Sequence, residues 1–211
     1  MEDMKTVAEM RMVGGHPCLD FVNTVDSRGD RWGPDLLVAY ADLVAWALRA
    51  EVIDGIFGRA LLAEALRHPD KAKEALEFAR ELREALYSVL RAEATGALVP
   101  KAALSTVAEA VHLALPMRML ACDGDGLKWA WVEADNLDAI AHRLAFEGAD
   151  FLTGREGRRA VRECPGPNCG WLFLDTSRGG HRRWCSDASC GTRSRVERFR
   201  LKPVVAKGGK S

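Results

Sequence analysis

Four of the six cysteines of this chain lie within one short segment near its C-terminal end. Four residues separate Cys164 from Cys169, four separate Cys185 from Cys190, and fifteen lie between the two pairs. Two thiolate pairs at this spacing are typical of a tetrahedral zinc site, and four sulfur ligands make a structural rather than a catalytic shell. The PGPN stretch at residues 165–168 supplies the turn that brings the first pair together. The cluster therefore predicts a small unit that folds around zinc instead of a large hydrophobic core.

Disulfides, free thiols and a zinc site that includes His181 are the competing interpretations. Six cysteines are too few for a disulfide scaffold in a chain of 211 residues. The chain opens without a signal-type leader and has no apolar run long enough to cross a bilayer, so we expect a cytoplasmic protein without membrane contact. His181 lies among arginines, where a phosphate or solvent contact is favoured. Cys18 and Cys122 stand alone in apolar surroundings, which predicts that both are buried.

Charge is distributed unevenly along the chain, although 30 basic and 30 acidic residues give a net charge of zero. Residues 155–211 hold 14 Lys and Arg against 5 Asp and Glu, whereas residues 1–154 hold 16 against 25. Opposite signs in the two parts predict two functional units. The basic unit is the one expected to bind a polyanion.

Residues 1–154 are predicted to form a mostly helical domain with one small β-hairpin. Apolar residues recur at helical spacing, bounded by proline and glycine, in segments 34–53, 55–66, 69–95, 100–115 and 136–152. Two short β-type runs around Asp-Gly-Asp-Gly, at residues 118–134, predict the hairpin. The fold class is therefore mainly α.

Residues 155–203 are predicted to form the zinc finger, and residues 204–211 a disordered tail. WLFLD (171–175) and HRRWC (181–185) are expected to be strands around a glycine-bearing turn. A helix is expected to begin near Cys190 and to end before Pro203. This order resembles a treble-clef zinc finger, in which the helix dipole favours the thiolate of Cys190.

The motifs around these residues resemble a known family. CGWLFLD, SRGGHRRWC and CGTR, between Cys169 and Arg193, are similar to the CGNR zinc finger of bacterial transcription regulators. HPCLDFVNTVDSRG, which begins at His16, is similar to the opening of the ABATE domain that precedes that finger. The resemblance covers nearly the whole chain and implies a DNA-binding finger and a helical sensor domain for an undefined ligand. Thr192 replaces the name-giving asparagine, which puts a DNA contact by that asparagine in doubt but preserves a hydrogen-bonding group near a helix start.

Arginines crowd around the predicted zinc site, and their planar forks match phosphate groups and guanine edges. We expect a helix carrying the later arginines to enter the major groove of double-stranded DNA while the others hold the backbone. A solvated basic face, or pairing with the acidic helical domain, is the alternative. One finger buries little surface, which favours a homodimer. The predicted DNA contacts are Arg178, Arg182, Arg183, Arg193, Arg195 and Arg198.

The polar residues of the N-terminal motif, Asp20, Asn23, Thr24 and Arg28, have two interpretations. They line a small-molecule pocket between helices, or they cap a helix and pin a loop. An enzyme with its chemistry around Asp20, His16 and Arg28 is disfavoured, because the zinc shell is closed and no nucleophile–base pair or phosphate loop is present. We therefore expect a regulator and not an enzyme, with a zinc-stapled protein-interaction adaptor as a further alternative.

Overall fold

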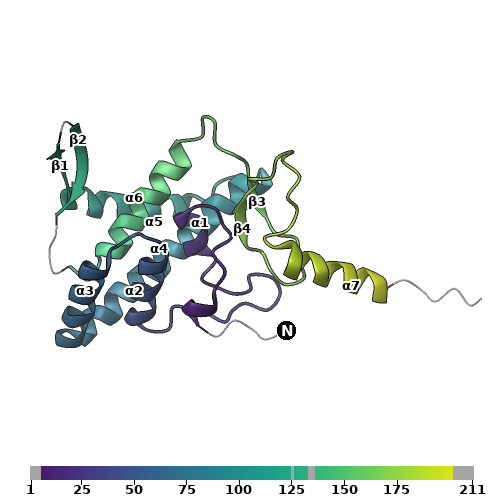
Figure 1. Cartoon of the computed structure of the whole chain (residues 1–211), viewed down its shortest axis with the longest axis horizontal. Helices are drawn as coiled ribbons and strands as arrows, with labels where there is room; N and C mark the ends of the chain where they lie inside the picture. The colour runs from purple at the N-terminus through teal and green to yellow at the C-terminus, as the bar shows by residue number, and fades with distance from the viewer. Residues whose placement is uncertain (1–5, 125, 133–135, 202–211) are drawn as a thin grey trace, which may run out of the picture.

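The computed structural model describes residues 6–124, 126–132 and 136–201, and most of the described chain is helical (Figure 1). The predicted tail, residues 204–211, lies outside the described residues. No described helix is long and apolar enough to span a membrane. The elements of the helical domain are η1 (Val7–Glu9), α1 (Pro17–Val22), α2 (Tyr40–Arg49), α3 (Gly55–Arg67), α4 (Pro69–Thr95), α5 (Lys101–Ala114), η2 (Leu115–Met117), β1 (Arg118–Asp123), β2 (Gly126–Trp131) and α6 (Ala139–Thr153). Those of the finger are β3 (Val161–Glu163), β4 (Leu172–Leu174), the π-helical turn Asp187–Gly191 and α7 (Thr192–Arg200).

Local signals set the ends of the long helix α4, which forms the centre of the helical domain. Pro69 occupies its first turn, where no amide donor is needed, and Gly96 ends it in the left-handed conformation with φ 70°. The neighbouring α3 begins after Asp54, whose carboxylate accepts hydrogen bonds from the N–H groups of Ile56 and Phe57. The predicted mainly helical class is confirmed.

Helix α2 begins later than predicted. Its first residue is Tyr40, because the carboxylate of Asp42 accepts hydrogen bonds from the N–H groups of Val38 and Ala39 at 2.9 and 2.7 Å and so caps the helix there. The two leucines ahead of the helix are still buried, but from a loop. Apolar spacing located this segment, whereas a side-chain cap decided where the helix starts.

The predicted hairpin is formed by β1 and β2, which pair antiparallel with Leu120 opposite Trp129. Gly124, with φ 59°, supplies the turn between them. The prediction that Cys122 is buried is wrong, because β1 projects from the helices and this thiol is exposed (Figure 1). Cys18 is buried, as predicted.

The prediction of a second strand in the finger, at residues 181–185, is wrong. β4 pairs instead with β3, which precedes Cys164, with Val161 opposite Leu174. The N–H of His181 is donated to Oγ of Ser177 at 2.9 Å, and the N–H of Arg182 to the side chains of Ser177 and Asp175. Side chains thus take the backbone donors that a strand ladder would have used.

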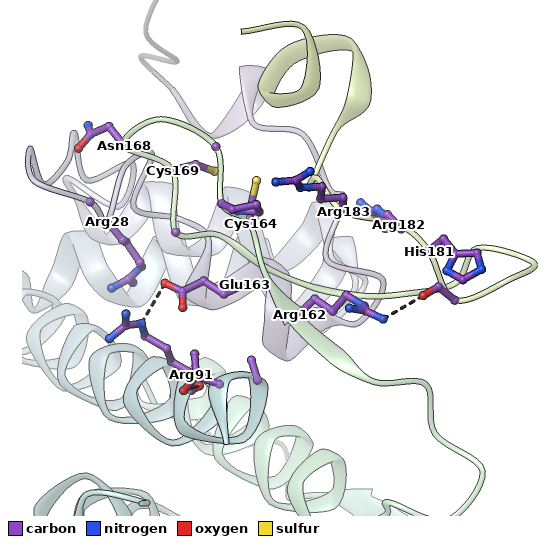
Figure 2. Close-up of a pocket in the computed structure, with 17 residues that line it drawn as sticks. Arg28, Arg91, Arg162, Glu163, Cys164, Asn168, Cys169, His181, Arg182 and Arg183 are labelled. Atoms are coloured by element: carbon purple, nitrogen blue, oxygen red, sulfur yellow. Dashed lines mark hydrogen bonds and ion pairs between the residues drawn. The ribbon is translucent and has the colours of Figure 1, made fainter. Parts of the chain in front are cut away.

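One hydrophobic core extends through both sequence-defined units. Trp171 and Phe173 of the finger are 1% and 0% exposed and belong to the same buried cluster as Phe21 and Trp46 of the helical domain. Helix α7 projects away from this body (Figure 1). A groove of about 730 Å³ lies between α4 and the finger (Figure 2).

Candidate metal centre and nucleic-acid interface

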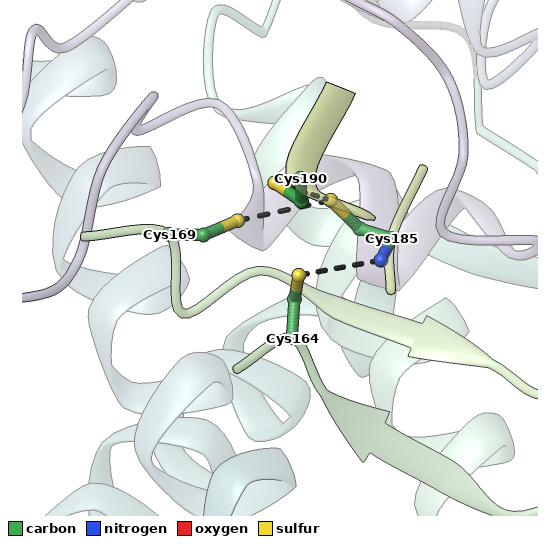
Figure 3. Close-up of side chains that lie close together, drawn as sticks. All are labelled: Cys164, Cys169, Cys185 and Cys190. Carbon is green, nitrogen blue, oxygen red and sulfur yellow. Dashed lines mark hydrogen bonds between the residues drawn. The ribbon is translucent and has the colours of Figure 1, made fainter. Parts of the chain in front are cut away.

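Figure 3 shows the four clustered cysteines with their sulfur atoms directed toward one another. All four Sγ atoms lie within 4.8 Å of one another, and Sγ of Cys185 is 3.7 Å from that of Cys169 and 3.6 Å from that of Cys190. Four sulfurs at about 2.3 Å from a tetrahedral zinc ion would be about 3.8 Å apart. A disulfide would require about 2.05 Å, and the described cysteines form none. The geometry therefore fits one zinc ion held by four thiolates.

The chain closes around this metal site. Cys164, Cys169, Cys185 and Cys190 are 2%, 8%, 1% and 3% exposed, which leaves no open position for a reacting water. The N–H of Cys185 donates to Sγ of Cys164 at 3.3 Å. A Cβ at Gly166 would lie 2.9 Å from Sγ of Cys190, so only glycine fits this turn. Both features indicate a structural centre.

The surroundings of Cys190 favour its thiolate form. Hydrogen bonds from the neighbouring thiols, Cys164 first, lower its pKa, and the charge of Arg193 acts in the same direction. Cys190 lies in the π-helical turn directly before α7, close to the predicted position at a helix start. In contrast, burial raises the pKa of Cys18 to about 12, so that thiol stays protonated. His181 is exposed and lies outside the cysteine cluster.

Asn23 joins the N-terminal motif to the zinc finger. Its buried side chain accepts a hydrogen bond from the N–H of Leu172 at 2.9 Å and donates one to the carbonyl of the same residue at 2.8 Å. The amide therefore pairs with β4 much as a neighbouring strand would. Nearby, the indole N–H of Trp171 donates to the carbonyl of Val25 at 2.8 Å.

Asp20 and Thr24 of the same motif bond to backbone groups that are near in sequence, and Thr24 also contacts Arg83 of α4. The Asp20 carboxylate accepts a hydrogen bond from the N–H of Gly14 at 2.8 Å, and burial raises its pKa to about 6. The Thr24 hydroxyl donates to the carbonyl of Phe21 at 2.7 Å and accepts from Arg83 at 3.1 Å. These are the contacts expected of the capping-and-pinning interpretation, while a ligand role stays a prediction.

Arg28 connects the knuckle of the finger to helices α1 and α4. Its guanidinium lies 3.9 Å from the ring centroid of Tyr87 and forms two hydrogen bonds to Glu84, at 2.7 and 3.1 Å. It also donates to the carbonyl of Val22 at 2.7 Å, while its backbone N–H donates to the carbonyl of Cys169 at 2.8 Å. Part of Arg28 lines the groove, so of the four N-terminal motif residues it alone reaches that cavity.

Arg182 is placed differently from the other predicted DNA contacts. Its half-buried guanidinium lies 4.4 Å from the ring centroid of Phe173. The same group donates hydrogen bonds to the backbone carbonyls of Val13, Leu174, Trp184 and Cys185. These contacts hold loop 181–185 in place of a strand ladder and leave the guanidinium little capacity for DNA.

The remaining predicted DNA contacts lie at the surface or beside the metal site. Arg178 is exposed in the turn after β4, and Arg183 is exposed with its guanidinium 4.9 Å from the Trp184 ring. Arg193 is half-buried and lines a small cavity next to Cys185 and Cys190. Arg178 therefore lies at the outer surface of the finger, whereas the exposed Arg183 also lines the groove that faces α4.

Arg195 and Arg198 are exposed on α7. Arg195 forms an ion pair with the Asp187 carboxylate at 3.0 and 3.1 Å. The Thr192 hydroxyl donates to the backbone carbonyl of Asp187 at 3.3 Å, as expected of a hydrogen-bonding residue near a helix start. Thr192, at the position of the asparagine in the CGNR motif, therefore supplies a hydrogen bond at this helix start.

Sequence reasoning missed the basic groove. Arg91 on α4 and Glu163 on β3 form an ion pair across it at 2.9 Å, whereas the Arg162 side chain, which also lines the groove, points away from this pair and donates to the carbonyl of Gly180 (Figure 2). Glu163 directly precedes the predicted zinc ligand Cys164. This position could have indicated that Glu163 lies close to the metal site. Nothing in the sequence around Arg91 indicates that this turn of α4 faces the finger.

Comparison with known families accounts for both parts of the chain. The profile of the ABATE family, described as "Putative stress-induced transcription regulator", matches residues 15–155, more than half of the chain. The profile of the CGNR zinc finger matches residues 160–202. No curated protein matches the chain. The chain therefore belongs to the ABATE family and carries a CGNR zinc finger after its ABATE domain.

Proposed function

We propose that this protein is a transcription regulator that binds double-stranded DNA through its zinc finger. The observation that carries the proposal is α7, which projects from the body and exposes Arg195, Arg198 and Arg200 (Figure 1). An α-helix fits the major groove of B-DNA, and arginine forks pair with guanine edges and phosphates.

The charge of the metal centre affects which arginines are available to bind DNA. Zinc with four thiolates has a formal charge of −2, which the nearby half-buried Arg193 partly offsets. The exposed arginines lie farther out, on α7 and on the turns of the finger, and are available to phosphates. Arg182 is left out of the proposed surface because its donors are already engaged.

Arg195 can exchange its partner when DNA arrives. Its ion pair with Asp187 is between two exposed side chains, and such pairs contribute little to stability. A phosphate therefore replaces the carboxylate at small cost. No catalytic role is proposed for the metal centre, because a closed four-thiolate shell offers no site for substrate or water.

The test is a salt series of duplex binding by the full-length, zinc-loaded protein. If about 4–6 phosphates are contacted, the log–log slope of affinity against salt is about −4 to −5. We expect Arg195→Ala and Arg198→Ala each to weaken binding about three- to tenfold and to reduce the slope by about one, with zinc retained. Asp187→Asn removes the competing carboxylate and is expected to strengthen binding about twofold or more.

Arg59→Ala is the matched control, because Arg59 is an exposed arginine on α3, in the helical domain. It should leave affinity and slope unchanged. Wild-type affinity for both α7 variants at every salt concentration, or an equal loss in the control, would remove α7 from the DNA surface. Selection of duplexes from a random pool, with and without chelator, would then give the preferred sequence.

A further inference from the structure

Two arginines of the helical domain, Arg11 and Arg31, lie beside the start of α7. The Nη1 atom of Arg11 donates to Oγ of Ser189, in the π-helical turn that leads into α7, at 2.7 Å. Arg31 lines a small cavity that Cys190 and Arg193 also line, at the base of the same helix. Both Arg11 and Arg31 are exposed. The basic surface of the finger therefore continues onto residues from a distant part of the chain.

The loop that carries Arg31 is fixed to the first cysteine knuckle of the finger. The side chain of Asn168 accepts a hydrogen bond from the N–H of Arg31 at 2.7 Å and donates one to the carbonyl of Arg31 at 2.9 Å. On the same loop, the N–H of Arg28 donates to the carbonyl of Cys169 at 2.8 Å. Both bonds to Asn168 use the backbone of Arg31, so its guanidinium takes no part in them. The knuckle thus positions the loop while the Arg31 side chain stays at the surface.

Close packing keeps this loop in place. A Cβ at Gly29 would lie 2.8 Å from Cα of Asn168, so only glycine allows the loop to approach the knuckle this closely. Within the loop, the N–H of Gly33 donates to the carbonyl of Ser27 at 2.8 Å. A loop that is already ordered loses little conformational entropy when a partner binds. Arg31 is therefore presented beside α7 before any partner arrives.

The position of these arginines relative to α7 suits the backbone of a duplex. Arg198 lies six residues after Thr192, the first residue of α7. A helix rises about 1.5 Å per residue, so these two residues are about 9 Å apart along its axis. The major groove of B-DNA is about 12 Å wide. Side chains at the base of α7 can therefore reach the phosphates at the edge of the groove in which Arg198 lies.

Three carboxylates accompany this surface and reduce its positive charge. Asp30 directly precedes Arg31 and is exposed, and the half-buried Asp26 lines the small cavity. Asp187 is exposed and pairs with Arg195 at 3.0 and 3.1 Å. A phosphate held by Arg31 would be repelled by the neighbouring Asp30. Removal of the Asp30 charge should therefore strengthen the binding of a phosphate at this point.

From these contacts we propose that Arg11 and Arg31 bind phosphates of the same DNA duplex as α7, so that the DNA surface spans both units of the chain. This inference rests on the proposed function and extends its surface to the loop between α1 and α2 and to the segment ahead of α1. The planar fork of arginine matches two phosphate oxygens at once. Such contacts fix the orientation of the finger on the duplex, whereas base contacts from α7 read the sequence.

Duplex binding by the full-length, zinc-loaded protein tests this surface. The probe is a short duplex of mixed sequence, because phosphate contacts do not depend on the bases. We expect Arg31→Ala and Arg11→Ala each to weaken binding about two- to tenfold and to reduce the log–log salt slope by about one. Asp30→Asn should strengthen binding about twofold. Arg59→Ala, which removes an exposed arginine of α3, is the matched control and should change neither affinity nor slope.

Gly29→Ala tests whether the knuckle positions the loop. Its methyl group would collide with Asn168 and displace Arg31 without changing any charge. Affinity should fall about as far as in Arg31→Ala, while the zinc content of the protein stays the same. Wild-type affinity in Gly29→Ala would contradict the role of the knuckle in presenting Arg31.

The outcomes separate this inference from the proposed function. Wild-type affinity and slope in Arg31→Ala and Arg11→Ala, together with weaker binding in Arg198→Ala, would overturn the inference and keep the proposed function. An equal loss in Arg59→Ala would also overturn it, because affinity would then follow net charge alone. If the wild-type protein binds no duplex at any salt concentration, the proposed function fails and this inference fails with it.

Discussion

At the residue scale, Asp20 is a carboxyl group whose pKa is shifted upward by its surroundings. Burial raises the pKa to about 6, and hydrogen bonds from the N–H groups of Gly14 and Val13 only partly oppose the shift. The folded protein therefore holds this proton more tightly than the unfolded chain, in which an aspartate titrates near 4. Protonated Asp20 therefore stabilises the fold by on the order of 2–3 kcal/mol relative to its ionised form. This stabilisation is fully present below pH of about 4 and is lost as the pH rises through about 6.

Replacing Asp20 with asparagine should remove this loss. Asp20→Asn keeps an oxygen for the Gly14 N–H and should raise the free energy of unfolding at pH 7–8 by on the order of 1–2 kcal/mol, as measured by denaturant unfolding. Asp30→Asn, the same change on an exposed loop, is the control. The direct readout is the carboxyl resonance of Asp20 in the wild type, and a midpoint near 4 would contradict the assigned environment.

Residue identity and spacing were enough to predict the zinc ligands but not the roles of the polar residues near them. A cysteine thiolate is a metal ligand in almost any fold, so the spacing of the four cysteines was enough to indicate the zinc site. The roles of Asn23 and Arg182 depend on backbone groups 149 and 169 residues away in sequence, which no local pattern specifies.

At the scale of elements, the pairing of Asn23 with β4 is what attaches α1 to the finger. Asn23→Ala would leave the buried N–H and carbonyl of Leu172 without these partners. Unsatisfied buried groups are costly, so the free energy of unfolding should fall by about 2–4 kcal/mol. Thr106→Ala, which removes a hydroxyl bonded within its own helix α5, should cost less than about 0.5 kcal/mol. Equal stability of both variants in denaturant unfolding would refute this account of the joint.

Elements that are specified by local signals were predicted well. The start of α4 at Pro69 and its end at Gly96 were predictable, because both residues act through their own backbone preferences. The start of α2 and the expected strand at 181–185 were wrong for a common reason. In both places, side-chain oxygens of Asp42, Asp175 and Ser177 accept backbone hydrogen bonds and change the local structure.

At the scale of the whole molecule, the charge split predicted two units but not the core that they share. Trp171 is buried against the helical domain and donates to the carbonyl of Val25, so the finger and the helices are expected to be stabilised together. The groove also depends on this contact between the units, because its lining residues come from α4 and from the finger. The distribution of charge can be read from the sequence, whereas the residues through which the two units contact each other are known only from the folded structure.

Native mass spectrometry of the full-length protein tests the central claim most directly. Four sulfurs within 4.8 Å of one another should hold one zinc ion per chain, and the observed mass should be that of the chain with one zinc. A metal-free mass, or a mass lower by about four hydrogens as expected for two disulfides, would contradict the account.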